Sequence, residues 1–517
     1  MEAPSLSSKN FVGEYIHVLT IAYHPDFRRI GEETKFVQIG DLKEPTQISR
    51  ITPNFSRPET RGQNPLLDGF VSRRPISLVQ RPDETLQIYA DEGGHKHSVN
   101  NQPLTSPKLF TVEEQNRGIV ILIARRIVLV LRRRPLVLRR NPGFGLVGSS
   151  NEIDSVRTNI LRVADTSTSV LIRGATGTGK ELVAQAIHDH SLRAKQPFVA
   201  VNMAAIPTTT AISQLFGHAK GAFSGAERDH KGYFGQAQNG TLFLDEVGET
   251  SVETQAALLR VLETKSVQSV GAEKNFSVDV RVISATDADL DQAVENGSLR
   301  EPLLHRLRAF EIEMPLLKDR PEDVGTLFVY FMRRELESLG EWEKWQQRSD
   351  YSEHWIEPQF ICQLIGYEFR GNVRELRNMV RRIVISSRGE RKLVTQDIQT
   401  VIAAQNISRS SLETLNLRVG SEEERASPPP SQIETPVLLE TLAACEWKAK
   451  DAAQALGISR SSLYNLIEQT PEIPKAKNLS LEQITEAKET FENDLEKMAH
   501  HFRVSRRALQ LRIKELG

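Results

Sequence analysis

The sequence predicts a multidomain protein: an all-β sandwich first, an α/β P-loop domain with a helical extension next, and a small all-α region last. Three observations predict this order. Short alternating apolar runs fill the first 135 residues, a glycine-rich loop near residue 175 joins an apolar run to an amphipathic one, and apolar residues recur at helical spacing after residue 437. A chain of 517 residues is long enough for three or four domains, at ~150 residues each.

The composition narrows the class of protein. The net charge is -1, so an interaction with nucleic acid has to come from a local basic patch. The chain has two cysteines, Cys362 and Cys445, which are too few for a disulfide framework. It contains no CxxC motif, the pattern that would indicate a metal site. The most apolar segment, 118–138, is interrupted by arginines and is too broken to span a bilayer, and the N-terminus shows no signal peptide. These features predict a cytoplasmic protein without a membrane partner.

The N-terminal region, 1–135, is typical of a β-sandwich because Gly, Pro, Asn and Asp clusters separate its apolar runs. These runs are His17–Tyr23, Ile76–Val79, Leu86–Tyr89, Ile119–Ile123 and Ile127–Leu131. We expect this region to be a regulatory sensor. It is not a phospho-acceptor receiver domain, because it lacks the acidic cluster and the alternating βα pattern of that class.

Four loop residues in this region resemble the forkhead-associated (FHA) domain, which binds phosphothreonine. They are Arg29 in an Arg-Ile-Gly segment, Ser72 and Arg73 in a Ser-Arg pair, and Asn100 in an Asn-Asn pair. Guanidinium and hydroxyl donors suit a phosphate because charge-assisted hydrogen bonds are strong. The resemblance implies a phosphothreonine protein or kinase as partner. The alternative is a sandwich that packs or senses without affinity for phosphopeptides.

The segment 169–191 has the pattern strand, loop, helix. Its loop is Gly174, Ala175, Thr176, Gly177, Thr178, Gly179, Lys180, Glu181. Glycines let backbone N–H groups turn toward phosphate oxygens, the helix N-terminus adds positive potential, and Lys180 reaches the outer phosphates. The segment is therefore predicted to be a P-loop that binds ATP. Glu181 stands where most P-loops have the Ser or Thr that contacts magnesium.

A second motif downstream supplies acidic groups. Residues 240–246 form an apolar run that ends in Asp245 and Glu246. Phosphoryl transfer needs positioning and charge neutralisation above all. We expect Asp245 to hold Mg²⁺ through water and Glu246 to polarise the attacking water.

The central region resembles the AAA+ ATPase of sigma-54-dependent transcription activators, the bacterial enhancer-binding proteins. That family carries Gly-Ala-Phe-Thr-Gly-Ala in a loop that contacts sigma-54, and this chain has Gly221, Ala222, Phe223, Ser224, Gly225, Ala226. The family P-loop also ends in Gly-Lys-Glu. The resemblance implies that Asn202 holds the catalytic Glu, that Arg300 and Arg306 act in a neighbouring subunit, and that Arg374 senses the γ-phosphate. Arginines acting in trans imply a ring, which in this family is usually a hexamer.

Several positions depart from the family pattern. Gln214 replaces a glutamate, Asp287 replaces a polar sensor asparagine, and Pro302 replaces an aspartate after the first of the two arginines. A carboxylate near the γ-phosphate adds like-charge repulsion. Asp287 therefore bears on turnover, whereas nucleotide binding is still expected.

The C-terminal part begins with a polar run, 404–436, predicted to be a flexible linker. Apolar spacing then predicts a helix-turn-helix over 437–517, similar to the Fis-type DNA-binding end of the same family, and an offset of 46 residues indicates a second copy. The candidate DNA contacts are Arg460, Ser461, Ser462, Tyr464, Arg506 and Arg507. The alternative for each copy is a helical bundle that only dimerises.

Together these predictions describe a sigma-54-dependent activator. We expect an FHA-like sensor over 1–135, an AAA+ core over 145–318, its helical lid over 319–403, the linker over 404–436 and the DNA-binding region over 437–517. The AAA+ domain would bind ATP and Mg²⁺ and remodel sigma-54 RNA polymerase at a promoter near the bound upstream DNA. The alternative is a DNA-bound, phosphopeptide-reading adapter whose AAA+ domain binds nucleotide only as a switch.

Overall fold

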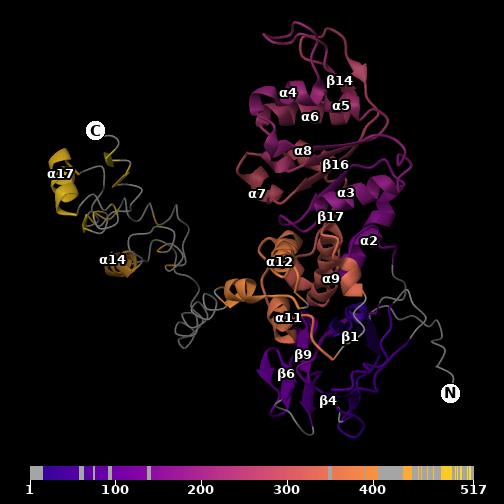
Figure 1. Cartoon of the computed structure of the whole chain (residues 1–517). Coiled ribbons are helices and arrows are strands. Elements are labelled where there is room, and N and C mark those ends of the chain that lie inside the picture. Colours follow the sequence, from indigo (N-terminus) through magenta and orange to yellow (C-terminus); the bar gives the residue numbers. More distant parts are fainter. Residues whose placement is uncertain are drawn as a thin grey trace. The chain divides into compact units, whose positions relative to one another are not determined.

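The structure is a computed structural model in two compact units, Met1–Asn406 and Ile407–Gly517. In the first unit it describes residues 15–57, 63–73, 76–90, 96–136, 141–346, 352–390, 392–403 and 405. In the second it describes 435–444, 452, 456, 463, 470, 479–491, 495, 498, 501–502, 509–510 and 512–513. Figure 1 shows the elements of both units.

The N-terminal region consists of two antiparallel sheets. The larger has the order β2-β1-β10-β9-β6-β7, and the smaller has the order β3-β4-β5-β8. The strands are β1 (Tyr15–Tyr23), β2 (Glu33–Phe36), β3 (Thr46–Ile48), β4 (Ile76–Gln80), β5 (Leu86–Ala90), β6 (Ser98–Val99), β7 (Gln102–Pro103), β8 (Lys108–Phe110), β9 (Ile119–Ile123) and β10 (Ile127–Pro135), with helix α1 (Val112–Arg117) before β9. An apolar core that includes Leu19, Leu78, Ile88 and Ile121 lies between the sheets. The sheet-rich prediction is confirmed, whereas its FHA identity stays a prediction.

The central region is a parallel sheet of five strands in the order β12-β13-β16-β11-β17. Its strands are β11 (Val170–Arg173), β12 (Phe198–Asn202), β13 (Thr241–Asp245), β16 (Arg281–Thr286) and β17 (Phe310–Glu313). The helices around it are α2 (Asn151–Ala164), α3 (Lys180–Asp189), α4 (Thr208–Phe216), α5 (Gly232–Gln236), α6 (Val252–Thr264), α7 (Leu290–Glu295) and α8 (Glu301–Leu307). Because the strands run parallel, their carboxyl ends meet along one edge, where open α/β sheets bind ligands.

The helical lid follows the sheet. It contains α9 (Pro321–Ser338), α10 (Trp342–Gln346), α11 (Pro358–Ile365) and α12 (Asn372–Ser386). Prolines at the starts of α9 and α11 suit the first helical turn, where an N–H has no intrahelical partner. The α/β P-loop domain with a helical lid is therefore confirmed.

The outer face of the larger β-sheet is covered by the lid, which the sequence did not predict. In Figure 1 the lid helices α9 and α11 lie next to strands β1 and β9. Tyr23 and Val128 belong to one buried apolar cluster with Phe328, Trp355 and Phe360 of the lid. The Tyr23 hydroxyl donates to the carbonyl of Ile356 at 3.0 Å, and the Trp355 indole donates to the carbonyl of His24 at 3.0 Å. Strand β1 is thus covered on both faces, which explains its nearly continuous apolar sequence.

The second unit contains helices α14 (Thr435–Ala444) and α17 (Leu481–Thr490) among its described residues. Ser480 caps α17 in a reciprocal capping box with Gln483. Leu479, Ile484, Met498 and Leu509 form a small apolar cluster with α17. Among all described residues of the chain, no helix combines the length and apolarity needed to cross a bilayer.

Candidate nucleotide-binding site

The P-loop connects β11 to α3, as predicted, and its backbone is shaped by glycine. Gly177 has φ +78°, and a Cβ there would lie 2.2 Å from the carbonyl oxygen of Gly371 in the lid. Gly179 has φ +106° and directly precedes Lys180, the first residue of α3. The loop therefore needs glycine both for its conformation and for close approach of the lid.

Next to this loop lies a cavity of 360 Å³, within the range of about 300–1,000 Å³ typical of small-molecule sites. It brings together the P-loop, the acidic end of β13 and two helices of the lid. Its lining is Gly145, Leu146, Val147, Ile153, Thr176, Gly177, Thr178, Gly179, Lys180, Glu181, Leu182, Asp245, Glu246, Arg320, Leu327, Tyr330, Phe331, Arg334, Val373, Arg374 and Arg377.

The lining of the cavity combines two chemically different sets of groups. Leu146, Val147, Leu327 and Phe331 offer apolar surface that suits a planar base, while the P-loop offers backbone N–H groups and an ammonium that suit phosphates. Sequence reasoning missed the α9 contribution, including Tyr330. The helical period of α9 predicts an apolar face but does not say what that face covers.

Lys180 and Glu246 both line the cavity and form an ion pair. The Lys180 ammonium lies 3.7 Å from the Glu246 carboxylate and donates to the Gly174 carbonyl at 2.8 Å. Burial raises the pKa of Glu246, and the carboxylate of Asp287 adds to that rise against the opposing ammonium of Lys180. Glu246 also has φ +53°, a left-handed conformation that is uncommon outside glycine and clusters at functional sites.

Asp287 and Asn202, which the sequence predicts to lie near the reacting phosphate, are both close to the acidic pair. The Asp287 N–H donates to the Glu246 carboxylate at 3.4 Å, so the family departure at Asp287 lies beside the proposed base. The carboxamide oxygen of Asn202 accepts from the Ala205 N–H at 3.2 Å. Asn202 lies opposite Asp245 on the neighbouring strand, close to the acidic pair along the same sheet edge.

The lid arginine Arg374 contacts the P-loop, and its role as a sensor of the γ-phosphate stays a prediction. Arg374, in the first turn of α12, donates from Nη1 to the Thr176 hydroxyl at 3.2 Å, and its N–H donates to the Gly177 carbonyl at 3.2 Å. The neighbouring Asn372 donates to the Thr176 carbonyl at 3.2 Å. The lid therefore contacts the P-loop directly.

The segment 221–226 is a turn-rich loop. Gly221 donates to the Ala226 carbonyl at 2.8 Å, which closes the loop at its base. The Phe223 side chain is 48% exposed and rests edge-on against His218, with ring centroids 5.0 Å apart. An exposed aromatic on a surface loop is suited to contact a partner.

Arg300 and Arg306 are exposed near α8. Arg306 lies 3.5 Å from Glu263, an exposed ion pair. Neither arginine belongs to the nucleotide cavity's lining among the described residues of its own chain.

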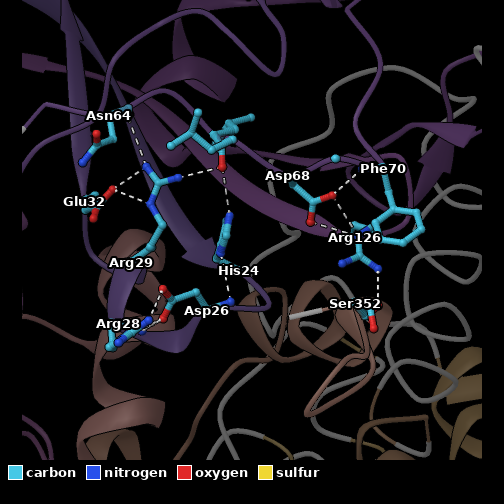
Figure 2. Close-up of a pocket in the computed structure, with 13 residues that line it drawn as sticks. His24, Asp26, Arg28, Arg29, Glu32, Asn64, Asp68, Phe70, Arg126 and Ser352 are labelled. Atoms are coloured by element: carbon cyan, nitrogen blue, oxygen red, sulfur yellow. Dashed lines mark hydrogen bonds and ion pairs between the residues drawn. The ribbon is translucent and has the colours of Figure 1, made fainter. Parts of the chain in front are cut away.

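The four FHA-like residues are all described, and Arg29 has a full set of partners. Its guanidinium donates to Glu32 and to the carbonyls of Asn64, Pro65 and Leu66, at distances of 2.7–3.1 Å. Figure 2 shows Arg29 beside His24 in a pocket that also contains the Arg126–Asp68 ion pair, 2.9 Å long. Arg29 therefore holds the loop after Asn64 in place in this structure.

The remaining FHA-like residues lie on loops. Ser72 and Arg73 are exposed, and Asn100 accepts from the Val120 N–H at 2.9 Å with φ +47°. The DNA-contact residues predicted from sequence, Arg460, Ser461, Ser462, Tyr464, Arg506 and Arg507, lie outside the described residues.

The fold and this site define a P-loop ATPase domain with a helical lid. Three family models match the chain: "Sigma-54 interaction domain" over 146–313, "AAA+ ATPase lid domain" over 318–414, and "Bacterial regulatory protein, Fis family" over 429–469. The matched segments begin at residue 146, after the N-terminal sheets. The second helix-turn-helix copy stays a prediction.

Curated relatives agree with these matches. NtrC of Proteus hauseri is 37% identical over 338 residues, which are 63% of this chain and 69% of that protein. ZraR of Salmonella typhimurium is 38% identical over 320 residues, 62% of this chain and 67% of that protein. AcoR of Bacillus subtilis, an acetoin dehydrogenase operon activator, is 37% identical over 329 residues, and the chain spans half of its length. The protein belongs to the sigma-54-dependent transcriptional activators.

Among solved structures, ADP-bound NtrX from Brucella abortus is 30% identical, with a TM-score of 0.44 and coverage of 63% of this chain and 69% of that one. The ATP-bound form of that protein is 32% identical, with the same TM-score of 0.44. The relatives are transcription regulators, so the comparisons do not favour the adapter alternative.

Proposed function

We propose that this protein binds upstream DNA and uses ATP hydrolysis to convert sigma-54 RNA polymerase from the closed to the open promoter complex. The observation that carries the proposal is the cavity where Lys180, Glu246 and Arg374 converge, in the same domain as the loop with exposed Phe223. A change at the phosphates would reach Arg374 and the lid directly, because Arg374 already contacts the P-loop.

The P-loop and the two carboxylates at the end of β13 divide the tasks of hydrolysis between them. Lys180 and the P-loop N–H groups hold the β- and γ-phosphates, and Glu246 orients the attacking water and accepts its proton. The carboxylate of Asp245, at the end of β13, suits the water shell of Mg²⁺, which prefers oxygen ligands. When bound there, Mg²⁺ would neutralise charge on the phosphate oxygens.

Hydrolysis would require a second subunit. Arg300 and Arg306 are exposed and do not line their own chain's cavity among the described residues, so we propose that they complete a neighbour's site in a ring, a hexamer as is usual in the family. An arginine in that position raises the rate by about 10³- to 10⁵-fold in other NTPases. Mixing Glu246→Gln chains with Arg300→Ala chains tests this. Recovered hydrolysis supports the shared site, and two inactive partners that stay inactive together contradict it.

The coupling to polymerase has a direct test. We expect Lys180→Ala to lose ATP binding, Glu246→Gln to bind ATP without hydrolysing it, and Phe223→Ala to hydrolyse ATP without binding sigma-54. Ile212→Ala, an exposed apolar substitution on α4, is the matched control for Phe223→Ala. Wild-type protein that hydrolyses ATP but never contacts sigma-54, even with a transition-state mimic, would contradict the proposed function.

The C-terminal region would hold this motor near the promoter. A DNA-bound tether raises the local concentration of the ATPase at the polymerase. Removing 437–517 should abolish binding to upstream DNA and leave ATP hydrolysis intact. Binding of DNA and polymerase would place the protein in the bacterial cytoplasm.

A narrower proposal concerns the N-terminal sheets, which we propose to bind a phosphothreonine protein through Ser72, Arg73 and Asn100. Exposure of Ser72 and Arg73 supports it, whereas Arg29 is engaged within the chain. Titration with a phosphothreonine peptide and its unphosphorylated twin tests it. Equal binding of the two peptides, or equal binding by Arg73→Ala, would refute this assignment.

A further inference from the structure

Helix α9 belongs to two sites at once. Val324 and Phe328 lie in the apolar cluster that joins the lid to the larger β-sheet. Leu327, Tyr330 and Phe331 of the same helix line the nucleotide cavity. A shift of α9 against the sheet would therefore change the shape of the cavity.

The first turn of α9 is held by arginines from β10. The Arg132 guanidinium lies 3.0 Å from the buried Glu322 carboxylate and 2.7 Å from Glu152 at the start of α2. Arg134 lies 3.5 Å from the same Glu322 and 3.2 Å from Glu33 of β2. A buried carboxylate with two guanidiniums fixes geometry strongly, because separating the partners would leave an uncompensated buried charge.

The residue after Glu322 fixes the rim of the cavity. The Asp323 carboxylate accepts from the Ser149 N–H at 2.6 Å, the Ser150 N–H at 3.1 Å and the Ser150 hydroxyl at 2.6 Å. Ser150 is the N-cap of α2, and Leu146 and Val147 just before it line the cavity. At the start of α9, Glu322 therefore contacts the larger β-sheet, and the next residue, Asp323, contacts the segment at the rim of the nucleotide cavity.

We propose that the N-terminal β domain is a built-in part of the nucleotide site, with Arg132 and Arg134 as positioning residues that act through Glu322 on α9. The inference rests on the proposed nucleotide site and adds a regulatory route to it. Any partner that displaces the larger sheet would alter ATP affinity, and bound ATP would in turn stabilise the contact between sheet and lid, since coupling between two sites is reciprocal.

The chain offers a matched pair of substitutions. Arg132→Met removes the guanidinium and keeps an unbranched side chain, whereas Arg133→Met changes the next residue, which faces the other way and pairs with exposed Glu84 at 3.4 Å. We expect Arg132→Met to weaken binding of a fluorescent ATP analogue and to raise the KM for ATP, on the order of 5- to 150-fold. The kcat at saturating ATP should stay near the wild-type value because Lys180 and Glu246 are untouched. Arg133→Met should match wild type.

A measurement on wild-type protein covers the case in which Arg132→Met does not fold. Added ATP analogue should slow amide hydrogen exchange in β1 and β10 more than in β4 and β5, which belong to the far sheet of the same domain. Lys180→Ala should show no such difference, because it does not bind nucleotide.

The outcomes separate this inference from the proposed function. Wild-type protein that binds no nucleotide overturns both. Nucleotide binding that leaves β1 and β10 no better protected than β4 and β5 overturns the inference alone, as does an Arg132→Met variant that folds and binds ATP as Arg133→Met does. Selective protection together with a raised KM supports it.

Discussion

Replacing Gly325 with alanine should weaken the packing of the lid against the β domain. In an exposed helix this change would stabilise the protein by about 1 kcal/mol, because alanine has the higher helix propensity. Here a Cβ at Gly325 would stand 2.1 Å from the carbonyl oxygen and 2.8 Å from the carbonyl carbon of Ala22 in β1. Both are backbone atoms, so the strand or the helix would have to move by more than about 1 Å to reach ordinary contact.

Helix propensity and packing predict opposite signs for the change in the free energy of unfolding, so the measured sign tells the two apart. Overpacking of this kind costs about 1–3 kcal/mol or more, and a gap of about 1 Å forfeits up to half of the dispersion energy of the atoms around it. We therefore expect Gly325→Ala to lower the free energy of unfolding by up to about 2 kcal/mol, once the gain of about 1 kcal/mol in helix propensity is subtracted.

Urea unfolding followed by tryptophan fluorescence measures this change, because Trp342, Trp345 and Trp355 of the lid are three of the four tryptophans. Gly366→Ala is the control, since its new Cβ would meet nothing closer than 3.7 Å. A Gly325→Ala variant that is as stable as Gly366→Ala, or more stable than wild type, would refute the close packing of β1 against α9.

Three further predictions concern stability and reactivity. Burial lowers the pKa of His24 to about 4 from 6.5, so the unfolded chain binds a proton between these values and the folded one does not. Stability should fall by about 2 kcal/mol from pH 7.5 to pH 5, and His24→Gln should flatten that slope in urea titrations. Burial raises the pKa of the Cys362 thiol to about 12, so in a Cys445→Ser background a disulfide reagent should react only at the rate of unfolding. Thr111→Ala removes the capping box of α1 with Glu114 and should cost about 1 kcal/mol in thermal unfolding; an unchanged midpoint would contradict the cap.

Much of the nucleotide site could be predicted from sequence because its signals are local. The spacing of Gly174, Gly177 and Gly179 between an apolar run and a helix specifies the loop, and the acidic pair directly follows its strand. Because the strands are parallel, Asp245 and the P-loop lie at the same edge of the sheet, with β16 between their two strands. Tyr330, Arg334 and Arg377 could not be assigned in this way, because their helices reach the cavity only through lid packing.

In the N-terminal region the contacts of a candidate site residue could not be predicted from sequence. The apolar runs predict strands, and a short motif predicts that Arg29 binds a ligand. In the structure the Arg29 guanidinium donates to Glu32 and to three carbonyls. Those carbonyls belong to residues 64–66, more than thirty positions further along the chain. A motif of a few residues carries no information about which distant backbone groups reach it.

The P-loop, the acidic strand end and the loop motif around Phe223 can be recognised from the chain alone, since each depends on residues within a few positions of one another. Only the tertiary structure decided what covers the outer face of β1 and what balances Glu322. Arg132 and Glu322 are 190 positions apart. Such a contact forms only when a whole sheet and a whole helix pack and bury their apolar faces. It is therefore a property of the packed molecule and cannot be derived from either segment alone.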